Sequence, residues 1–223
     1  WNMPRLGTFN LHASLLPQYR GAAAINWAVI TGDAETGITT FFLKHEIDTG
    51  EIIDQVRVPI ADTDNVEIVD DKLMHLGGDL VVKTVDAILE GNVKTIPQEQ
   101  LAAATELRPA PKIFKETCRI DWQAGVKKVY DFVRGLSPYP AAWTELHQGD
   151  AAPLALKIFE TEKVFIAHNL KPGSIVTDKK TYFQIASTDG FVKVLSLQLA
   201  GKKRMEVADF RRGYRHVEDS FVE

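Results

Sequence analysis

Residues 10–53 read NLHASLLPQYRGAAAINWAVITGDAETGITTFFLKHEIDTGEII, and this stretch decides the fold of the first half of the chain. Its apolar segment 22–30 is typical of a short helix, which Gly32 ends. The β-branched and aromatic residues of 37–43 predict a strand, and the alternating segment 52–60 predicts another strand after a polar loop. Short strands that alternate with helices indicate an α/β layer.

The polar motif inside this stretch has three parts, which are N-L-H at 10–12, S-L-L-P-Q-Y-R-G at 14–21 and D-T-G at 48–50. A predicted strand over 6–12 presents Asn10 and His12 on one side, because side chains alternate along a strand. Open α/β sheets bind ligands at the carboxyl ends of their strands, and we expect the D-T-G turn to bring Asp48 to that edge. The sequence therefore predicts one site that contains all three side chains.

These three residue types suit the transfer of an acyl group. The amide of Asn donates a hydrogen bond to a developing oxyanion. The ring of His donates or accepts a proton near neutral pH, and Asp orients that ring or favours its protonated form. We therefore predict that Asn10, His12 and Asp48 are catalytic.

The clearest helix in the sequence follows the second strand. Asp64 and Glu67 have the spacing of a capping box, and Gly91 ends the pattern. This helix completes the α/β part, which we assign to residues 1–104. Between the cap and Gly91, apolar residues recur with a helical period at Val66, Val69, Leu73, Leu76, Leu80 and Ile88.

Residues 105–115, TELRPAPKIFK, contain two prolines and several charges and predict a linker. Residues 116–223 then form a second domain, in which we predict a helix over 121–134 with Asp121 as its N-cap. Short segments with the composition of strands follow and are separated by turns, which is typical of a small barrel or sandwich. We expect these strands at 143–146, 154–159, 174–176, 182–187 and 191–199.

The net charge of −4 is the sum of two unlike halves. Residues 1–107 carry 7 Lys and Arg against 16 Asp and Glu, a net charge of −9. Residues 108–223 carry 19 Lys and Arg against 14 Asp and Glu, a net charge of +5. Such asymmetry suggests two domains with different partners, of which the basic domain faces something anionic.

Several classes of protein and site are excluded by the composition and the motifs. No apolar run approaches the roughly 18 residues of a membrane helix, so no membrane partner is expected. The single Cys118 cannot form an internal disulfide, and no signal peptide pattern is present, so we expect a cytoplasmic protein. No Walker, GxGxxG or GxSxG motif occurs, so a nucleotide-dependent enzyme and a serine hydrolase have no support. The histidines show no HxxxH or HExxH spacing, so we expect no metal site. The sequence does not indicate an oligomeric state.

The stretch 10–53 resembles the signature of the folate-dependent formyltransferases, whose pattern is an N-x-H strand tip, SLLPxxRG, a helix, TGxT and D-x-G. The resemblance implies the second half of a Rossmann-like formyltransferase domain. It matches Asn10, His12 and Asp48 to the family's catalytic residues. It also implies 10-formyltetrahydrofolate as the formyl donor, and no metal. The residues that match the segment lining the folate site are Ser14, Leu15, Leu16 and Pro17.

The second domain selects among the members of this family. Residues 115–146 and 195–214 resemble the beginning and the end of the C-terminal domain in those members that formylate methionyl-tRNA. In these members the domain is an OB-like barrel that contacts tRNA. The resemblance therefore implies initiator methionyl-tRNA as the acceptor. A neutral amine would attack the formyl carbon directly, with protonated His12 and Asn10 on the oxyanion and Asp48 supporting His12.

Clusters of Lys and Arg in the second domain agree with this implication, because binding to a phosphate backbone depends on surplus positive charge. Such contacts position a nucleic acid and do not read its bases. The clusters are Lys127 with Lys128, Lys179 with Lys180, Lys202 to Arg204, and Arg211, Arg212 and Arg215. A run of charge is more commonly a solvated face, so we do not assign individual phosphates.

Two departures from the family pattern are visible. Ala24 stands where the family has a proline after R-G-A-A, which does not touch the chemistry. The βαβ units that precede the N-x-H strand in the family are not present before residue 10, so we expect a C-terminal fragment whose own activity is open. Two alternatives also stay open, a sugar-nucleotide formyltransferase and an RNA-binding module without catalysis.

Overall fold

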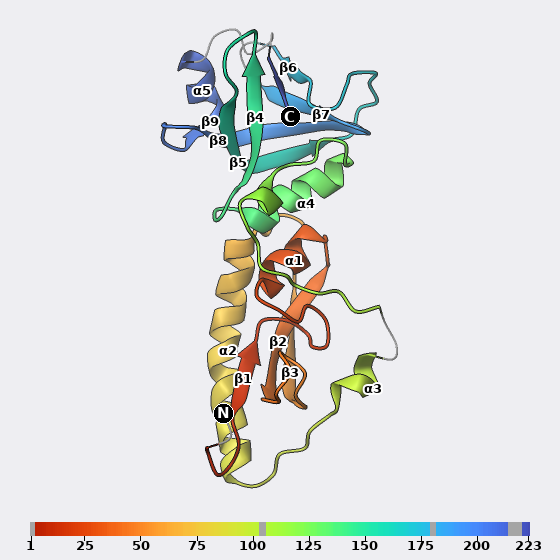
Figure 1. Cartoon of the computed structure of the whole chain (residues 1–223), viewed down its shortest axis with the longest axis vertical. Helices are drawn as coiled ribbons and strands as arrows, with labels where there is room; N and C mark the ends of the chain where they lie inside the picture. Colours follow the sequence, from red (N-terminus) through yellow and green to blue (C-terminus); the bar gives the residue numbers. More distant parts are fainter. Residues whose placement is uncertain (1–2, 103–105, 179–181, 214–219) are drawn as a thin grey trace. The chain divides into compact units, whose positions relative to one another are not determined.

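The computed structural model describes residues 3–102, 106–178, 182–213 and 220–223 (Figure 1). The contacts between residues divide the chain into two compact units. The first unit contains Trp1–Val29 and Asp33–Ile113, and the second contains Ile30–Gly32 and Phe114–Glu223. Each unit has a sheet and a core of its own, and each is described separately below.

The first unit contains a three-stranded sheet in the order β1-β2-β3, formed by β1 (Phe9–His12), β2 (Glu35–Phe42) and β3 (Ile52–Pro59). All three strands were predicted, and their α/β class is confirmed. Both pairs of strands run antiparallel, although the connection over 13–34 is long enough for a parallel crossover. In this antiparallel sheet the carboxyl ends of neighbouring strands lie at opposite edges. His12, at the end of β1, therefore does not share a carboxyl edge with the end of β2, as it would in a parallel sheet.

Helix α2 (Val66–Leu89) lies alongside this sheet and covers one of its faces (Figure 1). The Thr84 hydroxyl lies 2.9 Å from the Thr40 hydroxyl of β2, and both residues are buried. The capping box predicted at the start of the helix is wrong. Asn65 is the N-cap and accepts a hydrogen bond from the Ile68 backbone at 2.9 Å, because the Asp64 carboxylate is already bound to Lys72 and to the Ala61 backbone.

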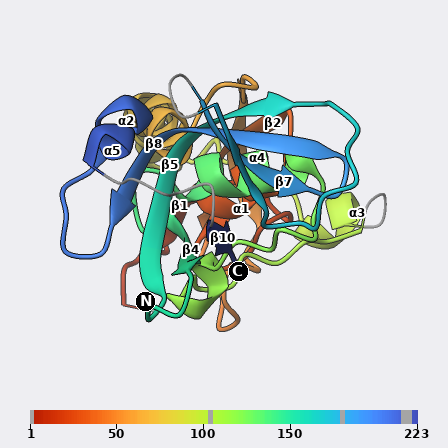
Figure 2. The same ribbon diagram turned by 90° about the horizontal axis from the view of Figure 1, so that it is seen from above.

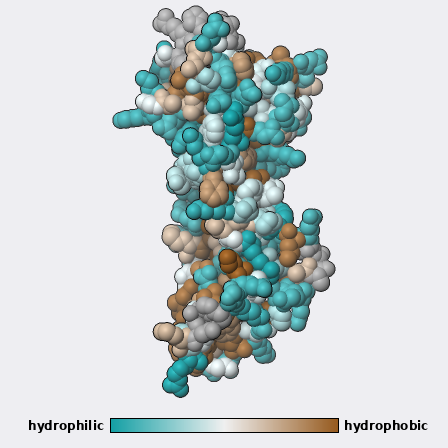
Figure 3. Space-filling view, in the orientation of Figure 1, coloured by the Kyte–Doolittle hydropathy of each residue, from teal (hydrophilic) through white to brown (hydrophobic). Residues whose placement is uncertain are grey.

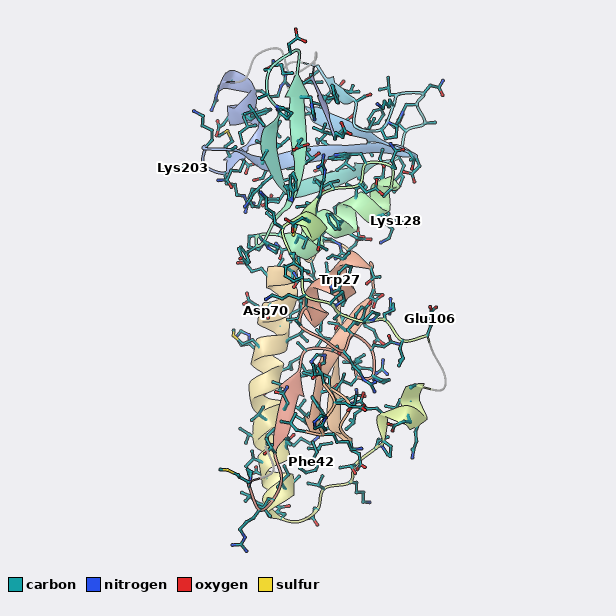
Figure 4. The ribbon with its side chains drawn as sticks, viewed as in Figure 1. Trp27, Phe42, Asp70, Glu106, Lys128 and Lys203 are labelled. Carbon is teal, nitrogen blue, oxygen red and sulfur yellow. The ribbon has the colours of Figure 1, made fainter. Side chains whose placement is uncertain are left out.

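Helix α1 (Ala24–Ile30) contributes the buried residues Ala28 and Val29 to the core of the first unit. It begins at Ala24, two residues after the predicted start. The indole of Trp27 donates a hydrogen bond of 2.8 Å to the carbonyl of Pro111, and Figure 4 shows this side chain on α1. A short helix that was not predicted, α3 (Gln98–Ala102), follows α2.

The second unit is mainly β, as predicted. Its sheet has the order β10-β4-β5-β8-β7-β6, with β9 paired to β8. The ends of this order approach each other, because Ser174 bridges Phe221 and the Val222 backbone donates to the Gly173 carbonyl at 2.9 Å. The sheet is therefore a nearly closed barrel. Its strands are β4 (Ala142–Gln148), β5 (Leu154–Val164), β6 (Ile175–Thr177), β7 (Phe183–Ser187), β8 (Gly190–Leu199), β9 (Met205–Glu206) and β10 (Ser220–Val222).

Helix α4 (Val126–Leu136) packs against β5 and β8 (Figure 2). It begins five residues after the predicted N-cap Asp121, whose carboxylate instead accepts a hydrogen bond from the Gln123 backbone at 2.9 Å. The backbone N–H of Val126 donates to the Asp189 carboxylate at 2.7 Å. A residue distant in sequence therefore caps this helix. The short helices η1 (Glu116–Cys118) and α5 (Val207–Gly213) were not predicted.

Hydrophilic side chains dominate the visible face of the second unit in the space-filling view (Figure 3). Within the described ranges, no helix has the length and apolar character that a membrane span requires. The longest helix, α2, carries charged residues such as Asp70, Asp71 and Lys83 along its length.

Candidate active site

The predicted catalytic residues of β1 lie on the sheet face opposite α2. Leu11 packs into the core beneath α2, and its neighbours in sequence, Asn10 and His12, therefore point to the other face. Register places His12 beside Thr39 of β2, and Thr39 beside Gln55 of β3. These residues form one row across the sheet, so the fold gathers polar side chains on the face that α2 leaves uncovered.

His12 is buried between two hydrogen-bond acceptors. Its Nε2 lies 2.9 Å from the carbonyl oxygen of Tyr19, so Nε2 carries a proton and donates it. Its Nδ1 lies 3.8 Å from Oδ2 of Asp48, which is the distance of an ion pair when the ring is protonated. Both ring nitrogens of His12 therefore face oxygen atoms of the protein. The sequence analysis predicted that Asp48 and His12 would be neighbours, and the structure brings them together.

Asp48 lies in a turn that is held from several sides. Its backbone has a φ of 56°, in the left-handed region that residues with a Cβ seldom adopt. Its Oδ2 accepts a hydrogen bond of 3.0 Å from the Gly21 backbone. A Cβ at Gly50 would lie 1.4 Å from the carbonyl oxygen of Phe42, so only glycine fits there. Gly50 is therefore a position of close backbone approach.

Asn10 is the most exposed of the three predicted catalytic residues. Its backbone pairs with Phe41 of β2 in the antiparallel ladder. Among the residues that the structure describes, its side-chain amide forms no hydrogen bond. The amide is therefore available to donate to a bound molecule on the same face as His12.

The segment predicted to bind folate follows β1 directly, and Ser14 within it is fully buried. The Ser14 hydroxyl donates to the Gln18 carbonyl at 2.6 Å, and the Ser14 carbonyl accepts from the Thr39 hydroxyl at 2.7 Å. Gln55 donates 2.9 Å hydrogen bonds to the Leu16 carbonyl and to the Thr39 hydroxyl. The segment is thus fixed to the same polar row of the sheet as His12.

Leu15, Leu16 and Pro17 line a groove of about 470 Å³, together with Gln55 and Arg57 of β3. Neither Ser14 nor the predicted catalytic residues line this groove. The structure therefore divides the predicted site into two parts, an apolar groove edge and a buried polar cluster. The two parts are joined through Thr39 and Gln55.

A long-range contact that the sequence did not indicate holds the Q-Y-R-G part of the loop. Arg108 donates two hydrogen bonds to the Asp33 carboxylate, at 2.7 and 2.9 Å, and its guanidinium lies 4.8 Å from the centre of the Tyr19 ring. The hydrogen bonds to Asp33 raise the pKa of Arg108 above its usual value. The Tyr19 backbone N–H donates to the Arg108 carbonyl at 2.7 Å. This contact fixes Tyr19, whose own carbonyl accepts the hydrogen bond from His12.

Gln98 is a second contributor that the sequence analysis missed. It is fully buried, and its amide nitrogen donates to the carbonyls of Asp48 and Gly50 at 2.8 and 2.7 Å. Its amide oxygen accepts two hydrogen bonds from Arg20. The side chain to which the Arg20 guanidinium donates is therefore this neutral amide. A single Gln after Pro97 carries no motif, so no sequence signal identifies it.

No group of three or more His, Cys, Asp or Glu residues with the arrangement of a metal site occurs in the described part of the chain. Several cations of the predicted basic clusters are paired within the second unit. Arg204 binds Glu160, Arg212 binds Asp209, and Lys127 lies 2.5 Å from Asp131. The Arg211 side chain is largely buried and lies 3.2 Å from Asp178.

Three lysines of these clusters have side chains with no ion-pair or hydrogen-bond partner among the described residues. They are Lys128 on α4, and Lys202 and Lys203 in the turn between β8 and β9. Figure 4 shows Lys128 and Lys203 projecting from the second unit. Lys179, Lys180 and Arg215 lie outside the described residues.

Family models match both parts of the chain. The formyl transferase model matches residues 1–85, and the model of the formyl transferase C-terminal domain matches residues 112–215. The polar cluster around His12 lies within the first match, and the unpaired lysines lie within the second.

Curated relatives match along the whole chain. A methionyl-tRNA formyltransferase of Phocaeicola vulgatus is 76% identical over 224 residues, which cover 100% of this chain and 69% of the relative. A methionyl-tRNA formyltransferase of Bacteroides fragilis is 72% identical over 221 residues, which cover 99% of this chain and 68% of the relative. The chain thus spans about two thirds of the length of these relatives.

Solved structures with a similar fold are formyltransferases and HypX. The N-formyltransferase from Helicobacter canadensis, in complex with folinic acid and dTDP-3-aminofucose, has a TM-score of 0.62 at 20% identity and covers 88% of this chain and 66% of its own. HypX from Aquifex aeolicus, in complex with tetrahydrofolic acid, has a TM-score of 0.59 at 20% identity. The match covers 91% of this chain and 34% of the HypX chain. At this identity the similarity concerns the fold alone.

Proposed function

This chain belongs to the family of methionyl-tRNA formyltransferases, and on that premise we propose that Asn10, His12 and Asp48 carry the transfer. The reaction moves a formyl group from 10-formyltetrahydrofolate to the α-amino group of methionyl-tRNA, for translation initiation. The observation that supports these residues is the position of Asn10 and His12 on one sheet face, with Asp48 Oδ2 of the following turn 3.8 Å from His12 Nδ1.

Each of the three side chains has a role in this proposal. The neutral α-amine attacks the formyl carbon, and a negative charge develops on the formyl oxygen of the tetrahedral intermediate. The Asn10 amide donates to that oxygen, and the positive charge of protonated His12 stabilises it without a direct hydrogen bond, because the two ring nitrogens face the Tyr19 carbonyl and Asp48. Asp48 supports His12 and orients its ring, because its Oδ2 lies 3.8 Å from Nδ1. The bond between the formyl carbon and the folate nitrogen then breaks, and the proton lost by the amine is transferred to that nitrogen.

We propose that the segment of Ser14, Leu15, Leu16 and Pro17 binds the folate donor, with Leu15, Leu16 and Pro17 in contact with it and Ser14 supporting them. Leu15, Leu16 and Pro17 supply an apolar edge to the groove, which suits the flat ring of a pterin. Ser14 acts indirectly, because its buried hydroxyl donates to the Gln18 carbonyl and its own carbonyl accepts from the Thr39 hydroxyl. Its part is to fix the backbone of the segment between His12 and the groove.

We propose that the second unit is an OB-like domain that contacts the tRNA. Its nearly closed sheet is compatible with that architecture. Three lysine side chains of this unit lack partners among the described residues, and they are Lys128, Lys202 and Lys203. Surplus exposed cations favour the phosphate backbone. A cytoplasmic location is also part of the proposal, because the reaction belongs to translation initiation.

The two alternative functions are not favoured. The sugar N-formyltransferase from Helicobacter canadensis resembles this chain at 20% identity, whereas the tRNA-formylating relatives reach 76%. A binding module without catalysis is disfavoured because the polar cluster with His12 and Asp48 is assembled in the fold. Buried polar groups would not be gathered there for a basic binding surface in the other unit.

The test is formylation of methionyl-tRNA by the complete gene product that contains these 223 residues. We expect His12→Ala and Asp48→Ala each to lower kcat by about 10² to 10⁴, the usual contribution of positioned acid–base groups. Asn10→Ala should cost about 10² to 10³, as for the loss of one oxyanion donor. The control is His75→Ala, which changes an exposed histidine of α2. Turnover near that of the parent in one of the three variants would overturn the role of that residue.

A further inference from the structure

The side chain of Gln98 connects three segments of the catalytic region that are far apart in sequence. It comes from the short helix α3, which lies 50 residues after Asp48. Its amide nitrogen donates to the carbonyls of Asp48 and Gly50, at 2.8 and 2.7 Å. Its amide oxygen accepts from Nε and Nη2 of Arg20, at 3.0 and 2.7 Å. The two donor and two acceptor sites of the amide are therefore all used.

The burial of Gln98 is not explained by core packing alone. Its exposed fraction is 0%, and burying a long polar side chain costs conformational entropy and hydration. An apolar side chain of similar volume would fill the same space without that cost. A fully satisfied polar group in this position instead imposes one geometry on its partners. Here those partners are the backbone of the D-T-G turn and the Arg20 guanidinium.

The turn requires such support, because Asp48 has the left-handed φ of 56°. A residue with a Cβ persists in that conformation only where the surrounding structure holds it. Two contacts hold Asp48 from opposite ends. Gln98 binds its carbonyl, and the Gly21 backbone binds its carboxylate Oδ2 at 3.0 Å, the same oxygen that faces His12.

The ring of contacts is closed through the backbone between Arg20 and Gly21. Arg20 binds the amide oxygen of Gln98, and the next residue, Gly21, binds the Asp48 carboxylate. Gly21 forms a bridge with Ala110, whose backbone donates to the Arg20 carbonyl at 2.9 Å, so this part of the backbone is held against that segment. Gln98, Arg20, Gly21 and Asp48 therefore form one closed circuit that sets the direction of the carboxylate.

We propose that Gln98 is a positioning residue for formyl transfer, which acts through Asp48 and is held in place by Arg20. Gln98 does not touch the reacting atoms in this assignment. It fixes the turn so that Oδ2 of Asp48 faces Nδ1 of His12, and a displacement of about 1 Å in such a site costs on the order of a hundredfold in rate. The assignment rests on the catalytic role proposed for Asp48.

The principal variant is Gln98→Glu, in the complete gene product. The substitution keeps shape and an acceptor for Arg20, and it replaces the amide donor by a carboxylate oxygen that faces two carbonyls. We expect kcat to fall by about ten- to a hundredfold while KM for methionyl-tRNA changes by less than about threefold. The matched control is Gln100→Glu, the same change at an exposed position of the same helix, which should leave both constants unchanged.

A double-mutant cycle with Asp48→Ala separates positioning from a general structural effect. Once the Asp48 carboxylate is removed, Gln98→Glu should cost less than about threefold, because its effect passes through that carboxylate. An equal loss in both backgrounds would overturn the proposal, as would parental kcat in Gln98→Glu alone. Parental activity of Asp48→Ala would instead overturn the proposed catalytic role itself.

Arg20→Lys provides the test if Gln98→Glu fails to fold. The lysine keeps the positive charge but cannot donate the two hydrogen bonds of the guanidinium to Gln98, so the amide is held more loosely. We expect a smaller fall in kcat, about three- to tenfold, that again vanishes in the Asp48→Ala background. A fall that persists in that background would overturn the assignment.

Discussion

The two units of this chain use polar residues in opposite ways. In the first unit, His12, Ser14, Thr39 and Gln98 are buried, and their hydrogen bonds join segments far apart in sequence. In the second unit the predicted clusters of cations are largely exposed, and several of their ion pairs are local. Arg212 with Asp209 and Lys127 with Asp131 are separated by only three and four residues.

This difference indicates which kind of function each unit supports. Buried polar groups keep fixed positions, which catalysis needs, and their strength does not depend on bulk salt. Exposed cations attract phosphates over a distance but are screened by salt. Substitutions in the first unit should therefore change kcat, and substitutions in the second should change affinity. Substitutions in the first unit that changed only affinity, or substitutions in the second that changed kcat, would contradict this division between the units.

The largest effect is expected for Gly50→Ala in the turn of Asp48. The new Cβ would lie 1.4 Å from the Phe42 carbonyl, so the turn must move away and lose its contacts with Gln98. We expect a loss of about 3 kcal/mol or more in the free energy of unfolding, and loss of formylation. Urea unfolding followed by circular dichroism measures the first effect.

The control for Gly50→Ala is the same substitution at Gly78 of α2. A Cβ there meets nothing within 4 Å. Alanine in a helix interior should stabilise the chain by about 0.5–1 kcal/mol, because glycine loses more conformational entropy. If both substitutions changed the free energy of unfolding in the same direction, the turn would not be the tightly held element described above.

An intermediate effect is expected for the unpaired lysines of the second unit. The double substitution Lys202→Gln with Lys203→Gln should weaken tRNA binding by roughly fivefold per lost phosphate contact near 0.15 M salt, and should flatten its salt dependence. The bound fraction of labelled tRNA, measured over a salt series, reports both quantities. The value of kcat at saturating tRNA should stay unchanged.

Lys94→Gln is the matched control for this prediction, because Lys94 is an exposed lysine of the first unit. It removes one positive charge outside the proposed surface, as each of the single variants Lys202→Gln and Lys203→Gln does within it, and should leave the salt dependence unaltered. An equal change in both proteins would mean that net charge, and not this turn, determines binding.

The smallest effect is expected for Asp189→Ala, at the start of α4. The substitution removes the acceptor for the Val126 backbone N–H. The loss of such a cap should cost about 1 kcal/mol of stability, and thermal unfolding measures it. Asp189→Asn keeps an acceptor oxygen and should retain most of the stability. A change in kcat in either variant would contradict the division of roles between the units.

The sequence predicted the elements whose signals are local. The strands over 9–12, 35–42 and 52–59 and the helix over 66–89 follow from side-chain pattern and composition. Caps were less predictable. Asp64 has the chemistry of an N-cap, but Asn65 is the N-cap of α2, because the Asp64 carboxylate is bound to Lys72. Asp121 has the same chemistry, but Gly125 is the N-cap of α4 and the distant Asp189 carboxylate accepts from the Val126 N–H.

The sequence by itself determined which residues are proposed to carry chemistry, since Asn10, His12 and Asp48 stand in a dense motif whose spacing places two of them on one strand face. The tertiary structure alone decided how they are held. Three features depend on contacts between distant segments. They are the antiparallel pairing of β1 with β2, the hydrogen bonds from Arg108 to Asp33, and the circuit through Gln98. A hydrogen bond across 50 residues leaves no periodic or compositional trace in a sequence, because any polar residue that the fold brings within reach can form it.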